Sequence, residues 1–379
     1  MKIYVLAGLF TLGLFTACYT TGQVKREFLK SSVGQEATRP YSNMALTATY
    51  VGSAIYQTDW YNWCVSPISG KDGKIHIFSA RWPANEGMDG WLGRNAQIAH
   101  FIADKPEGPF RFKGVVMETS MLPDTLTMRA PHNPRLEYVD GKYVLLYILQ
   151  NPQTRGQTGQ RVGMMIADDI NGKWRFAGDK DGIMVEPSNT PGHWTYKAAL
   201  GADNPAFLKI KDKYYIYYKC GAPKMFDAKY GYAVSDKLEG PYTLCDKPIT
   251  DNVSYLEDAQ AFAYNGNYYL LTTDNLGGNT GVFGDLMLWK SKTGLDFKLT
   301  DVQIAMGNIF DYWGTEKDKQ DLFDKGGYFE RHHSGKLERP AILFINGKPA
   351  YMYAVGGVNI NGGANSESYI FKISMENSD

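Results

Sequence analysis

The chain has 379 residues, of which 44% are hydrophobic and 14% aromatic, so it is long enough to bury a large core. Its 40 basic and 40 acidic residues cancel, which excludes the charge excess expected of a protein that binds nucleic acid or an anionic membrane surface. Cys64, Cys220 and Cys245 form neither a disulfide framework nor a metal-ligand spacing. We therefore expect a globular protein whose chemistry is carried by other side chains.

The first 18 residues have the pattern of a bacterial export signal. A short positive start precedes an apolar run that is too short to cross a membrane, and small residues then lead to Cys18. Phe15-Thr16-Ala17-Cys18 resembles a lipobox, in which the cysteine carries the lipid, and plain secretion is the alternative. Residues 19–45 are polar and aperiodic, and we predict that they form a tether to a single domain at 46–379. This pattern predicts export to the periplasm or cell surface, with the membrane reached only through a lipid anchor.

One hairpin motif recurs five times along the domain. Each copy has a polar segment, a strand, a tight turn and a second, often Tyr-rich strand. The copies begin at Ser66-Pro67, His132-Asn133-Pro134, Asp203-Asn204-Pro205, Glu257-Asp258-Ala259 and Glu338-Arg339-Pro340. Most turns are Asp-Gly or Asn-Gly, the dipeptides that favour a type I′ hairpin because both residues need φ > 0. We expect Pro67, Pro134, Pro205, Ala259 and Pro340 to occupy equivalent positions.

The spacing of the copies predicts the fold class. Counted between those five positions, the copies are 67, 71, 54 and 81 residues apart, which is room for about four strands each. A second apolar strand motif, followed by a Gly-containing turn and an aromatic residue, recurs between the hairpins. Helical periodicity is nearly absent beyond the N-terminus. The sequence therefore predicts an all-β, five-bladed β-propeller with four antiparallel strands per blade, and a β-sandwich or β-helix is the alternative.

In a propeller the inner strands begin around one mouth of a central channel, so the polar segments converge there. The charged or polar side chains that we expect at this mouth are Asp59, His132, Asn133, Asp203, Asn204, Glu257, Asp258, Glu338 and Arg339. Glycoside hydrolysis needs two carboxyl groups, one to protonate the leaving oxygen and one to activate water. The alternative is that these side chains only cap the blade corners through hydrogen bonds to the backbone.

Several of these segments resemble a known enzyme family. Glu257-Asp258-Ala259 before a Tyr-Tyr strand and Asp203-Asn204-Pro205 before Lys-Tyr-Tyr-Ile-Tyr-Tyr are similar to the five-bladed family 43 glycoside hydrolases and to families 32, 117 and 130. Trp63-Cys-Val-Ser66-Pro67, Phe78-Ser-Ala-Arg81-Trp82-Pro83 and Gln97-Ile-Ala-His100 more closely resemble a family 43-like group of glycosidases. The resemblance covers residues 50 to 375 and implies an inverting mechanism with a general acid, a general base and an acid that tunes the pKa.

The general acid and the pKa-tuning acid of this mechanism can be assigned to residues of this chain by position. The resemblance implies that Glu257 is the general acid, and the pKa-tuning position falls on Asn204, with Asp203 one residue earlier. We expect the like charges of Asp258 and Asp203 to raise the pKa of Glu257 and keep it protonated near neutrality. Relatives in family 117 also use a channel histidine, so His132 or His100 could be an acid or a sugar ligand.

The general base cannot be carried over. Its position falls on Ser66, a residue that cannot take up a proton at neutral pH, so Asp59 and Asp258 stay open as candidates. The Ser66 departure also motivates an alternative function, a non-catalytic carbohydrate-binding propeller. A protein-interaction propeller is a third reading, and it would predict exposed apolar patches rather than a ring of acids at the mouth.

Arg81 and Trp82 follow the second strand of the first repeat and offer a sugar a guanidinium fork and a stacking face. Arg81 could instead stack on Trp82 for structure, and Arg339 could simply pair with Glu338. We predict Glu257, Asp203 and Asp59 as catalytic residues. The predicted substrate-binding residues are Arg81, Trp82, His100, His132, Asn133, Asn204, Asp258, Glu338 and Arg339.

No cofactor is required by this chemistry, although the channel could hold a structural calcium ion. His332-His333 in the insertion before the last copy is expected to be exposed loop rather than a metal site. We expect a monomer that removes terminal sugars from oligosaccharides or polysaccharides of plants or algae, without a nucleic-acid partner.

Overall fold

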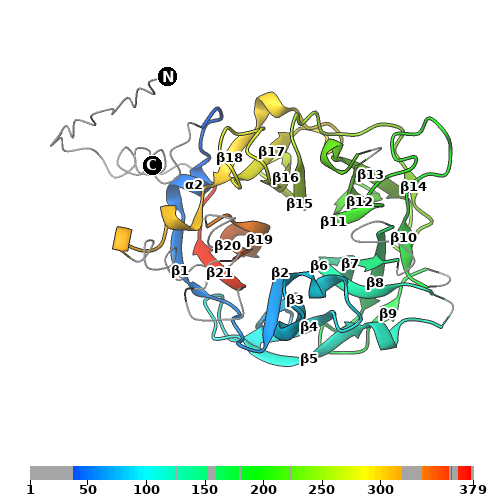
Figure 1. Cartoon of the computed structure of the whole chain (residues 1–379), viewed down its shortest axis with the longest axis horizontal. Coiled ribbons are helices and arrows are strands. Elements are labelled where there is room, and N and C mark those ends of the chain that lie inside the picture. Colours follow the sequence, from blue (N-terminus) through cyan, green and yellow to red (C-terminus); the bar gives the residue numbers. More distant parts are fainter. Residues whose placement is uncertain are drawn as a thin grey trace, which may run out of the picture.

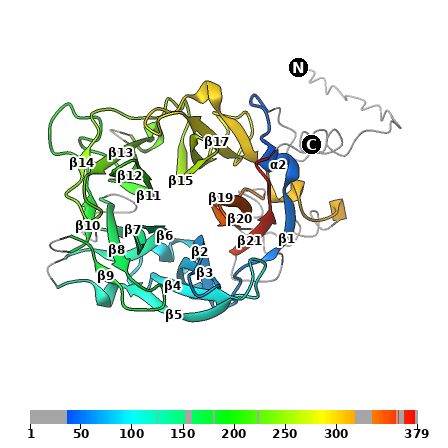
Figure 2. The same cartoon turned by 180° about the vertical axis from the view of Figure 1, so that it is seen from behind.

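The computed structural model describes residues 37–376 except for 125, 152–158, 179–180, 222–223, 318–334, 358–359 and 361–365. Five antiparallel sheets stand in a ring, each with one edge strand toward the axis (Figure 1). Seen from behind, the sheets follow the chain around the ring and the last sheet meets the first (Figure 2). The predicted five-bladed propeller is confirmed. No helix in the described part of the chain is long and apolar enough to cross a membrane.

The blades follow one another in sequence, each from inner to outer strand. Blade I comprises β2 (Trp60–Ser69), β3 (Ile75–Pro83), β4 (Gln97–Ala103) and β5 (Arg111–Glu118). Blade II comprises β6 (Arg129–Val139), β7 (Lys142–Gln150) and β8 (Arg161–Ala167), with the short strands β9 (Arg175–Phe176) and β10 (Ile183–Val185) both paired to β8. Blade III comprises β11 (Asp203–Ile210), β12 (Lys213–Cys220), β13 (Lys229–Ser235) and β14 (Thr243–Leu244). Blade IV comprises β15 (Leu256–Tyr264), β16 (Asn267–Asp274), β17 (Leu286–Ser291) and β18 (Gln303–Met306).

Blade V joins the two ends of the described chain. Its three inner strands are β19 (Glu338–Ile345), β20 (Lys348–Gly356) and β21 (Glu367–Lys372), and the outer strand is β1 (Thr49–Ser53) from the start of the domain. Just before β1, the helical turn α2 (Asn43–Thr47) buries Met44 and Ala45. Packed structure therefore begins before residue 46, and residues 37–45 of the predicted tether lie against the propeller.

The apolar core lies between neighbouring blades rather than at the axis. One cluster joins blades III and IV through Tyr217, Leu270 and Trp289, and similar clusters fill the other four gaps. Each sheet is therefore buried on both faces, which explains why the second strand of a blade is apolar or aromatic at almost every position. Most of the tyrosines in these strands fill these gaps, as β-propensity predicts.

The inner strand of every blade carries a bulge at the same level. The residue at the bulge has a left-handed backbone, with φ of 61° at Cys64, 50° at Asn133, 46° at Asn204, 75° at Asp258 and 54° at Arg339. This conformation costs a non-glycine residue roughly 1–2 kcal/mol. Strand pairing resumes two residues later, so the blade I position that matches Pro134 is Val65. The expected equivalence of Pro67 is therefore wrong by two residues, and that of Pro134, Pro205, Ala259 and Pro340 is confirmed.

Between the strands of blade I, short 3₁₀ turns cover the mouth of the ring. They are η1 (Ala84–Glu86) and η2 (Met88–Leu92), in the connection from β3 to β4. Other single turns are η3 (Thr119–Met121), η4 (Met225–Asp227), η5 (Leu299–Asp301) and η6 (Ile309–Asp311). At the opposite ends of the inner strands, Asp140-Gly141 and Asn265-Gly266 have φ > 0 at both residues, as a type I′ turn requires, whereas at Asp72-Gly73 only the glycine does.

Candidate active site

The bulges arrange the polar segments in two layers. The bulge residues themselves surround a void of about 10 Å³ on the axis, room for about one water molecule. Of the residues one position earlier, Trp63, Asp203, Glu257 and Glu338 line a cavity of about 270 Å³ at the mouth, which some bulge residues also reach. Its lining residues are Trp63, Trp82, Met88, Asp89, Trp91, Asn133, Gln160, Asp203, Asn204, Lys219, Glu257, Asn275, Lys336, Glu338 and Arg339.

The cavity has two chemically different walls. Trp63, Trp82 and Trp91 belong to blade I and its β3–β4 connection, and they form an aromatic wall together with Met88. The other lining residues belong to blades II, III, IV and V and are charged or carry amides, apart from Asp89 of the β3–β4 connection. A sugar ring has an apolar face and a rim of hydroxyl groups, so this arrangement suits one sugar lying against the indoles with its hydroxyls toward the charged wall.

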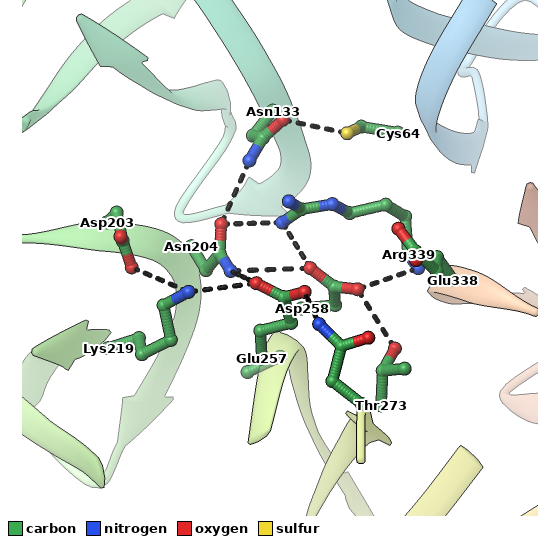
Figure 3. Close-up of polar contacts among 12 residues, drawn as sticks. Cys64, Asn133, Asp203, Asn204, Lys219, Glu257, Asp258, Thr273, Glu338 and Arg339 are labelled. Atoms are coloured by element: carbon green, nitrogen blue, oxygen red, sulfur yellow. Dashed lines mark hydrogen bonds and ion pairs between the residues drawn. The ribbon is translucent and has the colours of Figure 1, made fainter. Parts of the chain in front are cut away.

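Lys219 of β12 organises the charged wall (Figure 3). Its buried ammonium lies 2.9 Å from Glu257 Oε2 and 3.6 Å from Asp203 Oδ1, and it donates to Tyr255 Oη at 2.7 Å. Because both carboxylate oxygens lie within 3.6 Å of one nitrogen, they are less than twice that distance apart. These two carboxyl groups therefore lie side by side, as the convergence of the inner strands predicts.

Glu257 is held as a carboxylate. Besides Lys219, it accepts hydrogen bonds from Tyr255 Oη at 3.0 Å and from the side-chain amide of Asn275. Burial raises the pKa of Glu257, but the Lys219 ammonium and the Arg339 guanidinium outweigh burial, and this pKa falls to about 2. The expectation that like charges keep Glu257 protonated is therefore wrong, because sequence reasoning did not foresee a buried lysine beside it.

Asp203 binds a proton more readily than Glu257. Burial raises the pKa of Asp203 to about 6, since Lys219 offsets only part of the cost of burial. Within the described residues, Asp203 Oδ1 is buried and accepts no hydrogen bond. The Asp203 side chain is 3% exposed and that of Glu257 is 12% exposed, so Glu257 is the member of the pair that faces the cavity more openly.

Asp258 and Arg339 form a buried ion pair below the cavity. Asp258 Oδ1 contacts the Arg339 guanidinium and accepts from Asn204 Nδ2 at 3.3 Å, and its Oδ2 accepts from Thr273 Oγ1 at 2.9 Å. Burial raises the pKa of Asp258 to about 7, even though Arg339 opposes this rise. Asp258 lines the axial void but not the cavity, so the structure does not bring it to the substrate side.

The carboxylates at the axis do not fit a calcium ion. Oxygen atoms of Glu257, Asp258 and Glu338 lie within 4.8 Å of one another, which is close enough for a shared cation. Each of the three is already paired with a cationic side chain: Glu257 with Lys219, Asp258 with Arg339 and Glu338 with Lys336. A divalent ion would add charge beside three cations, so this cluster is neutralised by protein groups.

Two of the predicted sugar ligands lie on the aromatic side. Trp82 lines the cavity, stacks on Tyr61 at 5.5 Å and donates to Gly87 O at 2.8 Å. Arg81 points elsewhere: its guanidinium lies between the rings of Trp60 and Phe112, at 4.2 and 4.1 Å, and donates to Gln97. Arg81 is thus stacked for structure, on Trp60 and Phe112 rather than on Trp82.

Three further predicted residues do not line the cavity. Asp59 is exposed away from it, and His132 is buried behind Trp91, 2.6 Å from Ala130 O. His100 is buried within blade I, where its Nε2 lies 2.8 Å from His76 Nδ1 and His76 Nε2 lies 3.0 Å from Asp72 Oδ1. Cys18 and His332-His333 are outside the described residues.

Sequence reasoning missed several lining residues, of which Lys219, Asp89 and Lys336 carry charge. The sequence does contain a sign that Lys219 is unusual, because it is the one charged residue after the apolar and aromatic run of β12. A lysine in such a run is expected to be buried, and lysines are rarely buried without a partner. Asp89 lies in an irregular connection whose path nothing in the sequence fixes.

Comparison with known proteins supports the fold. No protein-family model and no curated protein matches the chain. A family 117 glycoside hydrolase of the marine bacterium Zobellia galactanivorans has a similar structure, with a TM-score of 0.61 and 16% identity over 89% of this chain and 94% of that one. An arabinanase of Bacillus subtilis has a TM-score of 0.53 and 15% identity, over 85% of this chain and 96% of that one. A third similar structure is a family 43 β-xylosidase/α-arabinofuranosidase from a compost metagenome, solved with xylotriose in a calcium-free form. Its TM-score is 0.51 and its identity 15%, over 89% of this chain and 95% of that one. Families 43 and 117 are among those that the sequence resembles.

Replacing Arg339 by Met should destabilise the protein strongly, because it leaves the buried Asp258 carboxylate without a cation. Breaking one side of a buried ion pair costs about 3–5 kcal/mol. The control is Arg175→Met, which breaks the surface pair with Glu239 and should cost at most about 1 kcal/mol. Urea unfolding measures both, and equal losses would contradict a central role of Arg339.

Adding calcium or a chelator should leave the urea midpoint of the wild-type protein unchanged if the axial carboxylates are neutralised by protein groups.

The buried His100 should make folding stability depend on pH. Burial, with His76 and Lys113 nearby, lowers the pKa of His100 from 6.5 to about 3 although Asp72 opposes this. Below pH 6.5 the unfolded chain binds a proton at His100 that the folded chain does not bind. The free energy of unfolding therefore falls as the pH drops from 6.5 towards 3, by at most about 1.4 kcal/mol per pH unit. His100→Gln should remove this part of the slope in urea unfolding between pH 7 and 4. A variant with the wild-type slope would contradict the assignment.

Proposed function

We propose that this protein is an exported glycoside hydrolase that removes terminal sugars from plant or algal oligosaccharides by an inverting mechanism. The observation that carries the proposal is the Asp203–Lys219–Glu257 unit, two carboxyl groups that share one ammonium at the wall of a sugar-sized cavity. A blade-corner cap would need only backbone partners, whereas these side chains face one another and the cavity.

The size of the cavity supports action at chain ends. Its volume of about 270 Å³ is just below the usual range of about 300–1,000 Å³ for sites that take drug-sized ligands. Such a cavity suits one sugar ring, with the rest of the saccharide leaving through the mouth. Xylotriose is bound in the compost-metagenome relative, which is consistent with an oligosaccharide as the substrate class here.

The charge of the unit supports acid catalysis. When the two carboxyls carry one proton, the unit with its ammonium is neutral, and Asp203 binds that proton more readily than Glu257. Since Lys219 lies near both oxygens, a small shift of its ammonium towards Asp203 would favour moving the proton to Glu257, which faces the cavity. Glu257 then donates this proton to the glycosidic oxygen as the C–O bond breaks.

One observation favours the second candidate, a carbohydrate-binding propeller without catalysis. Blade I has Trp63 and Cys64 at the level where blades III and IV have Asp203-Asn204 and Glu257-Asp258. A binding module would need the aromatic wall but no titratable pair. A screen for release of reducing ends from plant and algal oligosaccharides separates the two functions, because the binding module would bind without releasing sugar.

Replacing Glu257 by Gln should lower kcat about 10²–10⁴-fold on a natural oligosaccharide, the usual share of general acid catalysis. The loss should be much smaller on an aryl glycoside with a good leaving group, because that oxygen needs little protonation. Glu239→Gln, outside the cavity, is the control. Equal losses on both substrates would assign Glu257 to another role, and unchanged activity on both would remove it from the site.

We also propose that Cys18 carries a lipid, on the strength of the lipobox-like segment before it. In a bacterial host, the full chain should then be found in the membrane fraction. Cys18→Ala should release it into the soluble exported fraction, as judged by immunoblot. A wild-type protein that is already soluble after export would contradict lipidation and leave plain secretion.

A further inference from the structure

The charged wall lacks a general base for an inverting reaction. Such a reaction, which rests on the function proposed above, needs a second carboxylate about 6.5–9.5 Å from the acid, on the opposite face of the sugar. Glu338 has a carboxylate oxygen within 4.8 Å of one of Glu257, and Glu338 is paired with Lys336. Asp203 shares Lys219 with Glu257. Both therefore lie beside the acid and not across the cavity from it.

The opposite wall has one carboxylate among the described lining residues, that of Asp89. It belongs to η2, in the connection between β3 and β4 of blade I, and η2 packs against β3 and β6 of blades I and II. Glu257 begins the inner strand of blade IV, and blade IV is adjacent to blades III and V but not to blade I. Asp89 and Glu257 therefore face the cavity from non-neighbouring blades.

The backbone beside Asp89 is fixed on the aromatic wall. Gly90 is buried, and a Cβ at this position would lie 2.3 Å from the Trp82 indole, so the chain rests directly on that ring. The Trp82 indole N–H also donates to Gly87 O at 2.8 Å, one turn earlier. Asp89 itself is exposed, and no ion pair or hydrogen bond of its side chain is found among the described residues. A carboxylate without a cationic partner is available to accept a proton from water.

We propose that Asp89 is the general base of this site and supplies the carboxylate that the inner strand of blade I lacks. Asp89 takes a proton from a water molecule while the oxygen of that water forms a bond to the anomeric carbon. The C–O bond to the leaving group breaks, its electron pair stays on the leaving oxygen, and that oxygen takes the proton from Glu257. One water is consumed, two sugars result, and solvent exchange returns the proton from Asp89 to the Asp203–Glu257 pair.

The test compares Asp89→Asn and Asp89→Glu with Glu257→Gln. The substrates are the best natural oligosaccharide from the screen and the 2,4-dinitrophenyl glycoside of the sugar it releases. Attack by water is needed for either substrate, so Asp89→Asn should lose about 10²–10⁴-fold in kcat on both, whereas Glu257→Gln loses mainly on the natural one. Asp89→Glu, which restores a carboxylate, should regain part of the activity. Asp212→Asn, in the hairpin turn of blade III, should behave as wild type.

Three results would overturn the assignment. Full activity of a folded Asp89→Asn variant would remove Asp89 from the mechanism, and a loss in Asp59→Asn instead would move the base to that residue. Retention of anomeric configuration, followed by NMR of the first product, would replace the base with a nucleophile such as Glu338. If the unsubstituted protein hydrolyses no glycoside, the proposed function fails together with the assignment, whereas an active Asp89→Asn variant refutes the assignment alone.

Discussion

Three cationic side chains neutralise the three carboxylates that the inner strands bring together at the axis. Lys219, Arg339 and Lys336 each contact one of Glu257, Asp258 and Glu338. Removing any one of these cations would leave a buried carboxylate uncompensated, which typically costs about 3–5 kcal/mol. The same contacts set the proton affinities of the site, because Lys219 and Arg339 hold the pKa of Glu257 below that of Asp203. Stability and chemistry therefore depend on one charge arrangement.

The repeated bulge is what makes this arrangement available. Each bulge breaks the alternation of the inner strand, so that two successive side chains reach the axis at different levels. The deeper residues join blades to one another, as Arg339 does through Asp258 and Asn204. The shallower residues, Asp203, Glu257 and Glu338, open onto the cavity. A strained backbone position in each blade thus places two successive side chains at different depths, although Asn133, Asn204 and Arg339 of the deeper layer also reach the cavity.

The fold could be predicted because its signals are local and recur. Asx-Gly turns such as Asn265-Gly266 and the polar segments before the inner strands are visible without knowledge of any long-range contact. The meeting of Asp203 with Glu257 followed from the repeat alone. Lys219 and Asp89 could not be placed in this way: the partners of Lys219 lie on another strand and blade, and the path of the β3–β4 connection is set by packing on Trp82. The two-residue error at Pro67 has a similar cause, since blade I places its bulge at Trp63-Cys64-Val65, a segment with no acid or proline to mark it.

The ring is closed by the antiparallel pairing of β1 with β21, the first and the last described strands. During synthesis, β1 emerges early but has no partner until residues 367–372 have left the ribosome. Until then the chain holds an unpaired strand and an open gap between blades V and I. The order of synthesis therefore places closure of the ring after residues 367–372, later than the point at which blades I to IV can begin to fold.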